Sequence, residues 1–310
     1  MTVRITSGMM SANLLSDLNR NLYKMSELEN TISSGRKINK PSDDPVGVTY
    51  ALRYRSQLAS NEQFQRSTDS AQSWLDATDG QMGKATDVMT RLKELMVQSG
   101  SGTNPQSALD AAAEEVKQLK EQLVDIGNSK SGSKFIFNGQ NYDNMPYPST
   151  SGPDFAKVQT DNSAVQYVIG ENIKFQINTP GNDFFGKPYD STNTDPTSEK
   201  DNAFAIMDRL ITALGNGDQE AIGNELTNID SRMSKMLAGR SEVGARTNRV
   251  DLVSSRLNDE ELNITALQSK TEDADIAASM IKASSAQTVY EAALKSSASM
   301  ISTSLVDFMR

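Results

Sequence analysis

The fold is decided in the C-terminal part of the chain, where residues 250–292 read VDLVSSRLNDEELNITALQSKTEDADIAASMIKASSAQTVYEA. Apolar or small residues recur there at alternating spacings of three and four, which mark the a and d positions of a heptad repeat. These positions are Val250, Val253, Leu257, Ile264, Leu267, Thr271, Ala274, Ala278, Ile281, Thr288 and Ala292. Because the spacing continues through Leu305 and Phe308, the pattern predicts one coiled-coil helix over 250–308, roughly 85 Å long.

A helix of that length cannot bury itself inside a chain of 310 residues and needs a partner. The N-terminal segment carries a matching stripe at Leu15, Leu18, Leu22, Met25 and Ile32. This stripe ends at Gly35, a residue that readily takes the left-handed conformation of a helix C-cap. We therefore predict that the two chain ends pair. Since many a and d positions over 274–298 are Ala, Ser or Thr, the pair should be marginal alone and should pack with neighbouring subunits.

Further helices are expected between the two ends. One should begin at Pro45, with Asp43 or Asp44 as its N-cap, and another should run over 104–126. Residues 141–200 differ, because they hold six of the nine prolines. Apolar residues alternate there on both sides of residues 170–172, which predicts a β-hairpin. Asn138-Gly139 is a type I′ turn signal just before this region.

These patterns predict a mainly α fold. It is a discontinuous coiled-coil or helical-bundle rod built from both chain ends, with a small β-rich inserted domain. We expect three domains, namely a terminal coiled-coil domain of residues 1–40 plus 271–310, a helical-bundle domain of 41–140 plus 201–270, and the insertion of 141–200.

The composition excludes several kinds of site. The chain has no Cys and no His, so disulfides, thiolate nucleophiles, histidine bases and imidazole metal ligands are all absent. The formal charge of -9 and the lack of a Lys/Arg stripe argue against a nucleic-acid partner. No apolar run is long enough for a membrane span or for a cleaved signal peptide.

Other residues could be interpreted as functional. Asp43 and Asp44 could be paired carboxylates, but the flanking prolines favour a turn and a helix cap. Trp74 and most of the Met residues fit core packing, whereas Arg36, Arg246 and Arg249 fit either solvated surface or contacts to a neighbouring subunit. An enzyme or adhesive domain would rest on the acids of the insertion, Asp154, Asp161, Asp183 and Asp190, which form no recognisable motif. We therefore predict no enzyme, no cofactor and no metal.

Several motifs together resemble the bacterial flagellin family. They include the turn at Gly35, Arg36, Asn39, Pro41, Asp43, Asp44 and Pro45, the segments 91–98 and 135–139, and VGARTNR at 243–249. The resemblance covers both helical halves. Prolines on both sides of Asp-Asp are similar to the hook–filament junction branch of the family, whereas the terminal Arg310 is similar to flagellin itself.

The resemblance implies a structural flagellar subunit that joins hook to filament by self-assembly, with a filament subunit as the alternative. It implies a ring of identical copies, hook-associated protein 1 and flagellin as partners, an export chaperone, and secretion through the flagellar type III apparatus without a cleaved signal. Neither nucleic acid nor membrane is an expected partner. The expected assembly residues are Leu15, Leu18, Leu22, Met25, Ile32, Ala274, Ala278, Ile281, Leu305 and Phe308.

Overall fold

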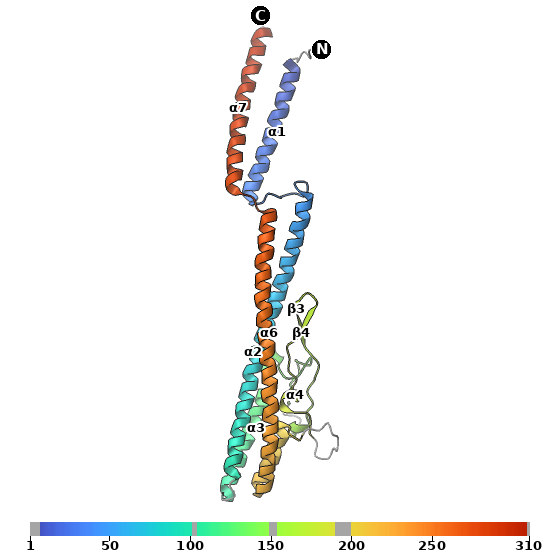
Figure 1. Ribbon diagram of the computed structural model, residues 1–310, viewed down its shortest axis with the longest axis vertical. Coiled ribbons are helices and arrows are strands. Elements are labelled where there is room, and N and C mark those ends of the chain that lie inside the picture. Colours follow the sequence, from blue (N-terminus) through green and yellow to red (C-terminus); the bar gives the residue numbers. More distant parts are fainter. Residues whose placement is uncertain (1–6, 101–103, 149–153, 190–199, 309–310) are drawn as a thin grey trace. The chain divides into compact units, whose positions relative to one another are not determined.

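The chain is mainly helical and carries two small antiparallel sheets, as the sequence predicts. The computed structural model describes residues 7–100, 104–148, 154–189 and 200–308 (Figure 1). The helices are α1 Ser7–Ser34, α2 Pro45–Ser99, α3 Gln106–Gly127, α4 Gly181–Phe185, α5 Ala203–Asn216, α6 Gln219–Glu272 and α7 Ile276–Phe308. The strands are β1 Lys130–Ser131, β2 Lys134–Phe135, β3 Gln166–Gly170 and β4 Ile173–Gln176, and a 3-10 turn spans Phe155–Lys157.

Contacts divide the chain into two compact units. Unit 1 comprises Met1–Ser60 and Asp259–Arg310, and unit 2 comprises Asn61–Asn258. The long helices α2 and α6 each contribute residues to both units. The division into three domains at residues 40, 140, 200 and 270 stays a prediction.

In unit 1, α1 and α7 lie side by side and run in opposite directions (Figure 1). The predicted end of α1 is confirmed, because Gly35 has a φ of 70° and its N–H donates to the carbonyl of Thr31 at 2.9 Å. The predicted continuous helix over 250–308 is wrong, because α6 ends at Glu272 and α7 begins at Ile276. Asp275 begins the new helix by accepting the N–H of Ala278 at 3.0 Å.

This interruption changes the heptad register. Beyond it, a row of partly buried side chains of α7 follows spacings of four, three, four and three, at Ser279, Ala283, Ala286, Tyr290 and Ala293. Ala278, a position of the predicted register, is also partly buried. The predicted register instead passed through Ile281, which is 71% exposed. We infer that the row from Ser279 to Ala293 faces α1, the helix that packs against α7 in this unit.

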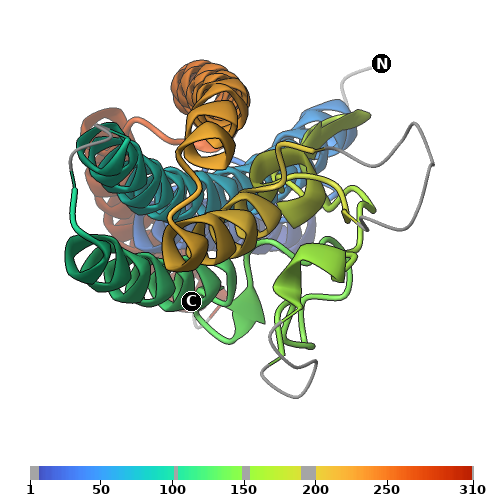
Figure 2. The same ribbon diagram turned by 90° about the horizontal axis from the view of Figure 1, so that it is seen from below.

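Unit 2 holds a helical core formed by α3, α5 and the adjoining parts of α2 and α6. Figure 2 shows α3 beside α5, in agreement with their contacts. The predicted stripe of α3 is buried at Leu109, Ala112, Val116, Leu123 and Ile126, with Leu119 partly buried. The core interpretation of Trp74 and of Met89, Met96, Met207 and Met236 is confirmed by their burial, whereas Met25, predicted with them, is only partly buried.

The hairpin predicted in the insertion is confirmed, with β3 and β4 antiparallel and Asn172 at a φ of 60° in the turn. The predicted type I′ turn at residues 138–139 is wrong, because that turn needs two residues of positive φ. Gly139 has a φ of 52°, but Asn138 is not among the residues of positive φ. The side chain of Asn138 instead donates to the carbonyls of Asn141 and Asn144, each at 3.0 Å.

Aromatic rings attach the insertion to the helices of unit 2. Phe137 and Phe184 stack at 5.9 Å, and Phe185 meets Phe137 edge-on at 5.1 Å between ring centroids. Tyr147 lies 4.9 Å from Phe204 of α5, and burial raises the pKa of its hydroxyl. Such pairs contribute about 0.5–1.5 kcal/mol each beyond the area that they bury. The insertion therefore shares one hydrophobic core with the helices.

A buried ion pair fixes the return of the chain from the insertion to α5. The side chain of Arg232, on α6, is fully buried and lies 2.8 Å from the carboxylate of Asp201. Its Nε also donates to the carbonyl of Asp201 at 2.6 Å, and its Nη1 donates to the carbonyl of Phe184 at 3.4 Å. The side chain of Arg232 leaves no room for a side chain at Gly186. A Cβ added at Gly186 would lie 2.8 Å from Nη2 of Arg232, and the φ of Gly186 is 109°.

We predict that Arg232→Ala lowers the free energy of unfolding of unit 2 by about 3 kcal/mol, because it leaves a buried carboxylate without its guanidinium. Urea unfolding followed by the fluorescence of Trp74 measures this change. The matched control is Arg91→Ala, whose half-exposed side chain pairs with Glu94 and Glu115, and which should lower the free energy of unfolding far less. Equal costs for the two variants would contradict the role assigned to Arg232.

Candidate assembly interface

The turn that follows α1 is built by local hydrogen bonds of its two aspartates. The carboxylate of Asp43 accepts the backbone N–H groups of Lys40 at 2.8 Å and Asn39 at 3.0 Å. These bonds lower the pKa of Asp43. Asp44 caps α2, since its Oδ1 accepts the N–H groups of Val46 at 3.1 Å and Gly47 at 2.9 Å. The turn-and-cap interpretation of both aspartates is therefore confirmed.

The turn closes tightly over the first turn of α2. Ile38 is buried against this segment, and a Cβ added at Gly47 would lie 2.6 Å from its Cδ1. The same Cβ would lie 2.5 Å from a carboxylate oxygen of Asp44. Such distances are far below van der Waals contact, so position 47 requires glycine as long as Ile38 and the cap keep their places.

The turn that follows α1 also forms backbone hydrogen bonds with the end of α6 and the residues just after it. The N–H of Lys37 donates to the carbonyl of Glu272 at 2.8 Å, and the N–H of Ala274 donates to the carbonyl of Gly35 at 2.9 Å. Arg36 and Asp273 thus form an antiparallel β-bridge. These bonds take up backbone groups that a continuous helix would use, which explains why α6 stops here.

Glu272, the last residue of α6, places a buried carboxylate beside these backbone bonds. Its side chain is only 2% exposed and accepts from Nε of Arg55 at 2.9 Å and also from Nη2 of Arg55. Nε of Arg36 lies 3.5 Å away, and Gln268 donates at 3.4 Å. The bond from Arg55 lowers the pKa of the Glu272 carboxyl, and the charges of Arg55 and Arg36 add to this. We call these four residues the Glu272 cluster.

Glu272 is not among the functional residues predicted from the sequence. In the predicted register it follows the a position Thr271, so an acid there is expected on a solvated face. Arg36 was identified, but its partner was expected to be solvent or a neighbouring subunit. The structure pairs it within the chain.

The α1 residues expected in assembly divide into two groups. Leu18 is buried, and Met25 and Ile32 are partly buried, in a row that also includes Leu14 and Leu28. Leu15 and Leu22 are exposed, by 61% and 39%. Leu14 and Leu28 were missed, although Leu14 lies four residues before Leu18 and Leu28 lies three residues after Met25, which are heptad spacings.

In α7 and just before it, Ala274 and Ala278 are partly buried and Ile281 is exposed. The side chains of Leu305 and Phe308 lie outside the described residues. The assembly role of the whole set stays a prediction. Exposed apolar residues on both terminal helices leave surface available for a partner.

The arginines of the 243–249 motif hold the hairpin on α6. Nη1 of Arg246 donates to the carbonyl of Asn178 at 2.8 Å, and the guanidinium of Arg249 lies 5.4 Å from the ring centroid of Phe175. Both contacts are internal to unit 2. This motif therefore positions the insertion.

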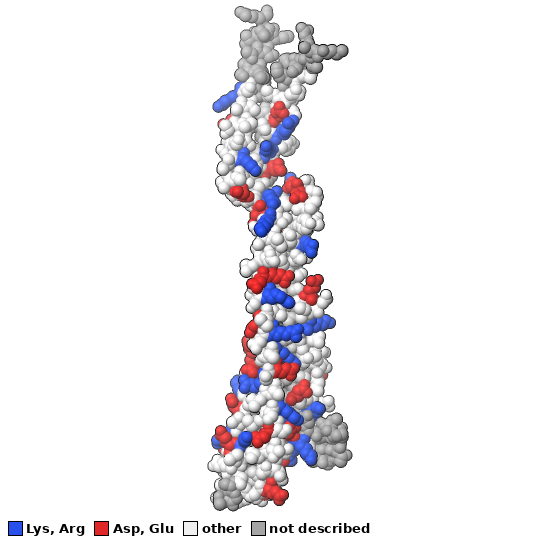
Figure 3. All heavy atoms as spheres, viewed as in Figure 1, with Lys and Arg blue, Asp and Glu red and all other residues white. Residues whose placement is uncertain are grey.

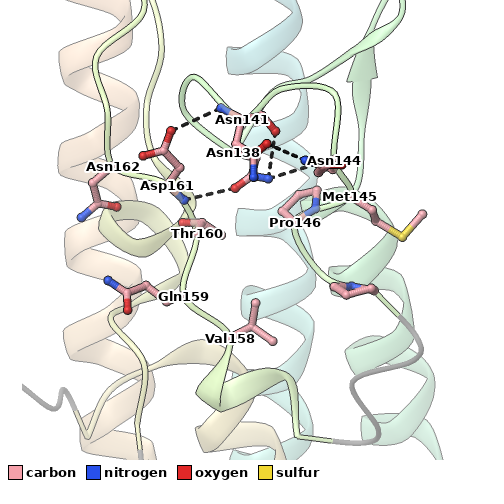
Figure 4. Close-up of a pocket in the computed structure, with 11 residues that line it drawn as sticks. Asn138, Asn141, Asn144, Met145, Pro146, Val158, Gln159, Thr160, Asp161 and Asn162 are labelled. Atoms are coloured by element: carbon pink, nitrogen blue, oxygen red, sulfur yellow. Dashed lines mark hydrogen bonds between the residues drawn. The ribbon is translucent and has the colours of Figure 1, made fainter.

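A pocket of about 500 Å³ lies in the insertion, between residues 138–148 and 158–162 (Figure 4). Its polar groups bond to one another and to residues just outside the lining, such as Gln140, Ser163 and Asn182. Asp161 accepts from the hydroxyl and N–H of Ser163 and from the N–H groups of Gln140 and Asn141, and these bonds lower its pKa. Asn138 accepts the N–H of Asp161 at 3.1 Å. These groups stabilise the loops that carry them.

On the face drawn in Figure 3, the described Lys and Arg residues are interspersed with Asp and Glu and form no continuous basic stripe. Among the described residues, no three His, Cys, Asp or Glu are grouped to hold a metal ion. Within those same residues, no helix is long and apolar enough to cross a membrane.

Comparison with known families matches both helical ends of the chain. Residues 5–142 match the bacterial flagellin N-terminal helical region, and residues 226–309 match the bacterial flagellin C-terminal helical region. The Glu272 cluster lies within these matches, with Arg36 and Arg55 in the first and Glu272 and Gln268 in the second. Most of the insertion lies between them.

Individual proteins are similar over most of the chain. It is 25% identical over 296 residues to flagellar hook-associated protein 3 of Escherichia coli (strain K12), covering 88% of this chain and 89% of that protein. It is 24% identical over 286 residues to flagellin of Bacillus subtilis (strain 168), covering 90% of each. Its fold is similar to that of flagellar hook associated protein-3 from Legionella pneumophila, with a TM-score of 0.60, 17% identity, and coverage of 71% of this chain and 98% of the other.

We predict that the stabilisation supplied by Glu272 depends on pH. A carboxyl whose pKa is lowered by folding stabilises the folded state above its unfolded pKa and loses that effect as pH falls through its folded value. The difference in free energy of unfolding between the wild type and Glu272→Gln should therefore shrink between about pH 6 and about pH 3. Urea titrations at several pH values, followed by circular dichroism, measure it. A difference that stays constant with pH would contradict the ionised pairing.

Proposed function

Since this chain belongs to the bacterial flagellin family, we propose that it is a structural subunit that joins the flagellar hook to the filament by helical self-assembly. The observation that carries the proposal is its similarity to flagellar hook-associated protein 3 across 88% of its length. The geometry supports assembly as the mode of action. Paired terminal helices leave apolar residues such as Leu15, Tyr23 and Ile281 exposed in the single chain.

The proposed partners follow from the position of a junction. Copies of this chain would form a ring, with hook-associated protein 1 on the hook side and flagellin on the filament side. An export chaperone would bind the subunit before the flagellar type III apparatus secretes it without a cleaved signal. We propose no catalytic role, no nucleic-acid partner and no membrane partner, in keeping with relatives that are structural proteins of the flagellum.

The alternative is a filament subunit of the flagellin type. It is favoured by the 24% identity to Bacillus subtilis flagellin over 90% of the chain. The two functions differ in stoichiometry and location. A filament subunit is the major protein of sheared flagella, whereas a junction subunit is confined to the boundary between hook and filament.

Labelling at a single introduced cysteine separates these functions. The chain has no Cys, and Glu171 is exposed in the turn of the hairpin, so Glu171→Cys creates one accessible thiol. On intact flagella, we expect a maleimide dye to mark one spot at the base of each filament. Unmodified cells provide the background. Label along the whole filament would support the alternative and contradict the junction role.

We predict that Ile281→Asp prevents filament attachment and leaves the monomer stable. Ile281 is 71% exposed in the single chain, so a carboxylate there costs little until a partner covers it. Desolvation of the charge would then cost several kcal/mol. The variant should secrete filament protein into the medium, while thermal unfolding of the purified monomer stays unchanged.

The matched control is Lys282→Glu, at the next position of α7, which is exposed and already carries a charge. It should keep its filaments. If Ile281→Asp cells also keep full-length filaments and swim, position 281 is not buried in the assembly.

A further inference from the structure

Two Asn-Gly pairs occur in the chain, at residues 138–139 and 216–217. In such a pair the backbone nitrogen of the glycine can attack the side-chain carbonyl carbon of the asparagine, because a glycine has no side chain to obstruct the approach. Both pairs belong to unit 2, but the structure holds them in different surroundings. They therefore form a matched comparison within one molecule.

The first pair is buried and fixed by hydrogen bonds. The side-chain amide of Asn138 donates to the carbonyls of Asn141 and Asn144 (Figure 4). Its Oδ1 accepts the N–H of Asp161 at 3.1 Å. Gly139 is buried as well, and a Cβ added there would lie 2.3 Å from the carbonyl oxygen of Asp161. Three hydrogen bonds must therefore break before the side chain of Asn138 can turn towards the nitrogen of Gly139.

The second pair lies at the end of α5. Asn216 is the last residue of this helix and is exposed, and its side chain makes no hydrogen bond to the described part of the chain. Gly217 has a φ of 66°, and its N–H donates to the carbonyls of Ala213 and of Leu214, the latter at 3.2 Å. The ends of helices open at little cost in free energy. Opening of this last turn frees the backbone nitrogen of Gly217.

We propose that Asn216 is a site of spontaneous modification, at which the folded chain converts asparagine to isoaspartate or aspartate, and that its fold protects Asn138 from the same reaction. The only co-reactant is water. The inference rests on contacts within unit 2 and not on the proposed function. Its test uses the purified protein, so its failure leaves the junction role unaffected.

The reaction has two steps. In the first, the nitrogen of Gly217 bonds to the side-chain carbonyl carbon of Asn216 and closes a succinimide ring. The side-chain nitrogen leaves as ammonia, taking the proton of the backbone nitrogen. In the second step, water opens the ring at either carbonyl carbon. Opening at the side-chain carbon gives aspartate, and opening at the backbone carbon gives isoaspartate, so an amide is replaced by a carboxylate in both products.

The modification alters the connection between α5 and α6. This connection is held by the N–H of Asp218, which donates to the carbonyl of Ala213 at 3.0 Å. Nε2 of Gln106, the first residue of α3, donates to the carbonyls of Leu214 at 3.1 Å and Gly215 at 3.2 Å. An isoaspartate adds a methylene group to the backbone at this point. Its carboxylate also places a negative charge at the C-terminal end of α5, where the helix dipole disfavours it.

Peptide mass spectrometry after incubation of the folded protein at mildly alkaline pH measures the two sites separately. Isoaspartyl methyltransferase with labelled S-adenosylmethionine counts the isoaspartate. We expect the reaction at Asn216 to be at least about tenfold faster than at Asn138. In urea the two rates should become similar, because the fold no longer distinguishes the sites. Asn216→Gln should lose most of the methyl incorporation, since the longer side chain closes a ring less readily.

Gln106 provides a second test, because its side chain holds the last turn of α5. Gln106→Ala should raise the rate at Asn216 about fivefold, the factor that corresponds to one hydrogen bond, and leave Asn138 unchanged. The matched control is Gln118→Ala, at an exposed position of the same helix, which should change neither rate.

Three results would overturn the proposal. The first is a reaction at Asn138 that is as fast as that at Asn216 in the folded protein. The second is an Asn216 that stays intact in the folded protein while the chain in urea is modified. The third is an unchanged rate at Asn216 in Gln106→Ala, because the last turn of α5 would then not control the reaction.

Discussion

The Glu272 carboxylate and the two backbone bonds beside it determine how unit 1 is built. They end α6, set the place where Asp275 begins α7, and fix the turn that leads from α1 into α2. Arg55 and Glu272 are 217 residues apart in sequence, so their contact closes a very long loop of chain. Unit 2 already brings α2 and α6 together, because the buried side chain of Asn61 on α2 donates to the carbonyl of Leu257 on α6. Contacts in unit 2 therefore offset part of the entropic cost of closing that loop.

Local chemistry explains which features could be predicted from the sequence. The aspartate cap at the start of α2, the glycine at the end of α1 and the alternation in the hairpin each depend on a few adjacent residues. The family resemblance depended on such segments too. These features follow from turn geometry and side-chain periodicity, which are visible in the sequence.

The break between α6 and α7 could not be predicted from periodicity alone. The spacing of three and four continues through Thr271, Ala274 and Ala278, so the heptad pattern shows no interruption. What ends the helix is a set of bonds to Gly35 and Lys37, which are distant in sequence. The attachment of the insertion has the same origin, because the partners of Arg232 and of Phe185 come from other parts of the chain.

The positions of the two units in the sequence affect the order in which they can fold. Unit 2 is one uninterrupted stretch, whereas unit 1 combines segments that precede and follow it. During synthesis, α1 is made before unit 2 and α7 after it, so α1 has no helix to pair with while the intervening residues are added. Unit 2 can fold in the meantime on contacts of its own. The ends meet last, and until then the chain has a folded middle and unpaired termini.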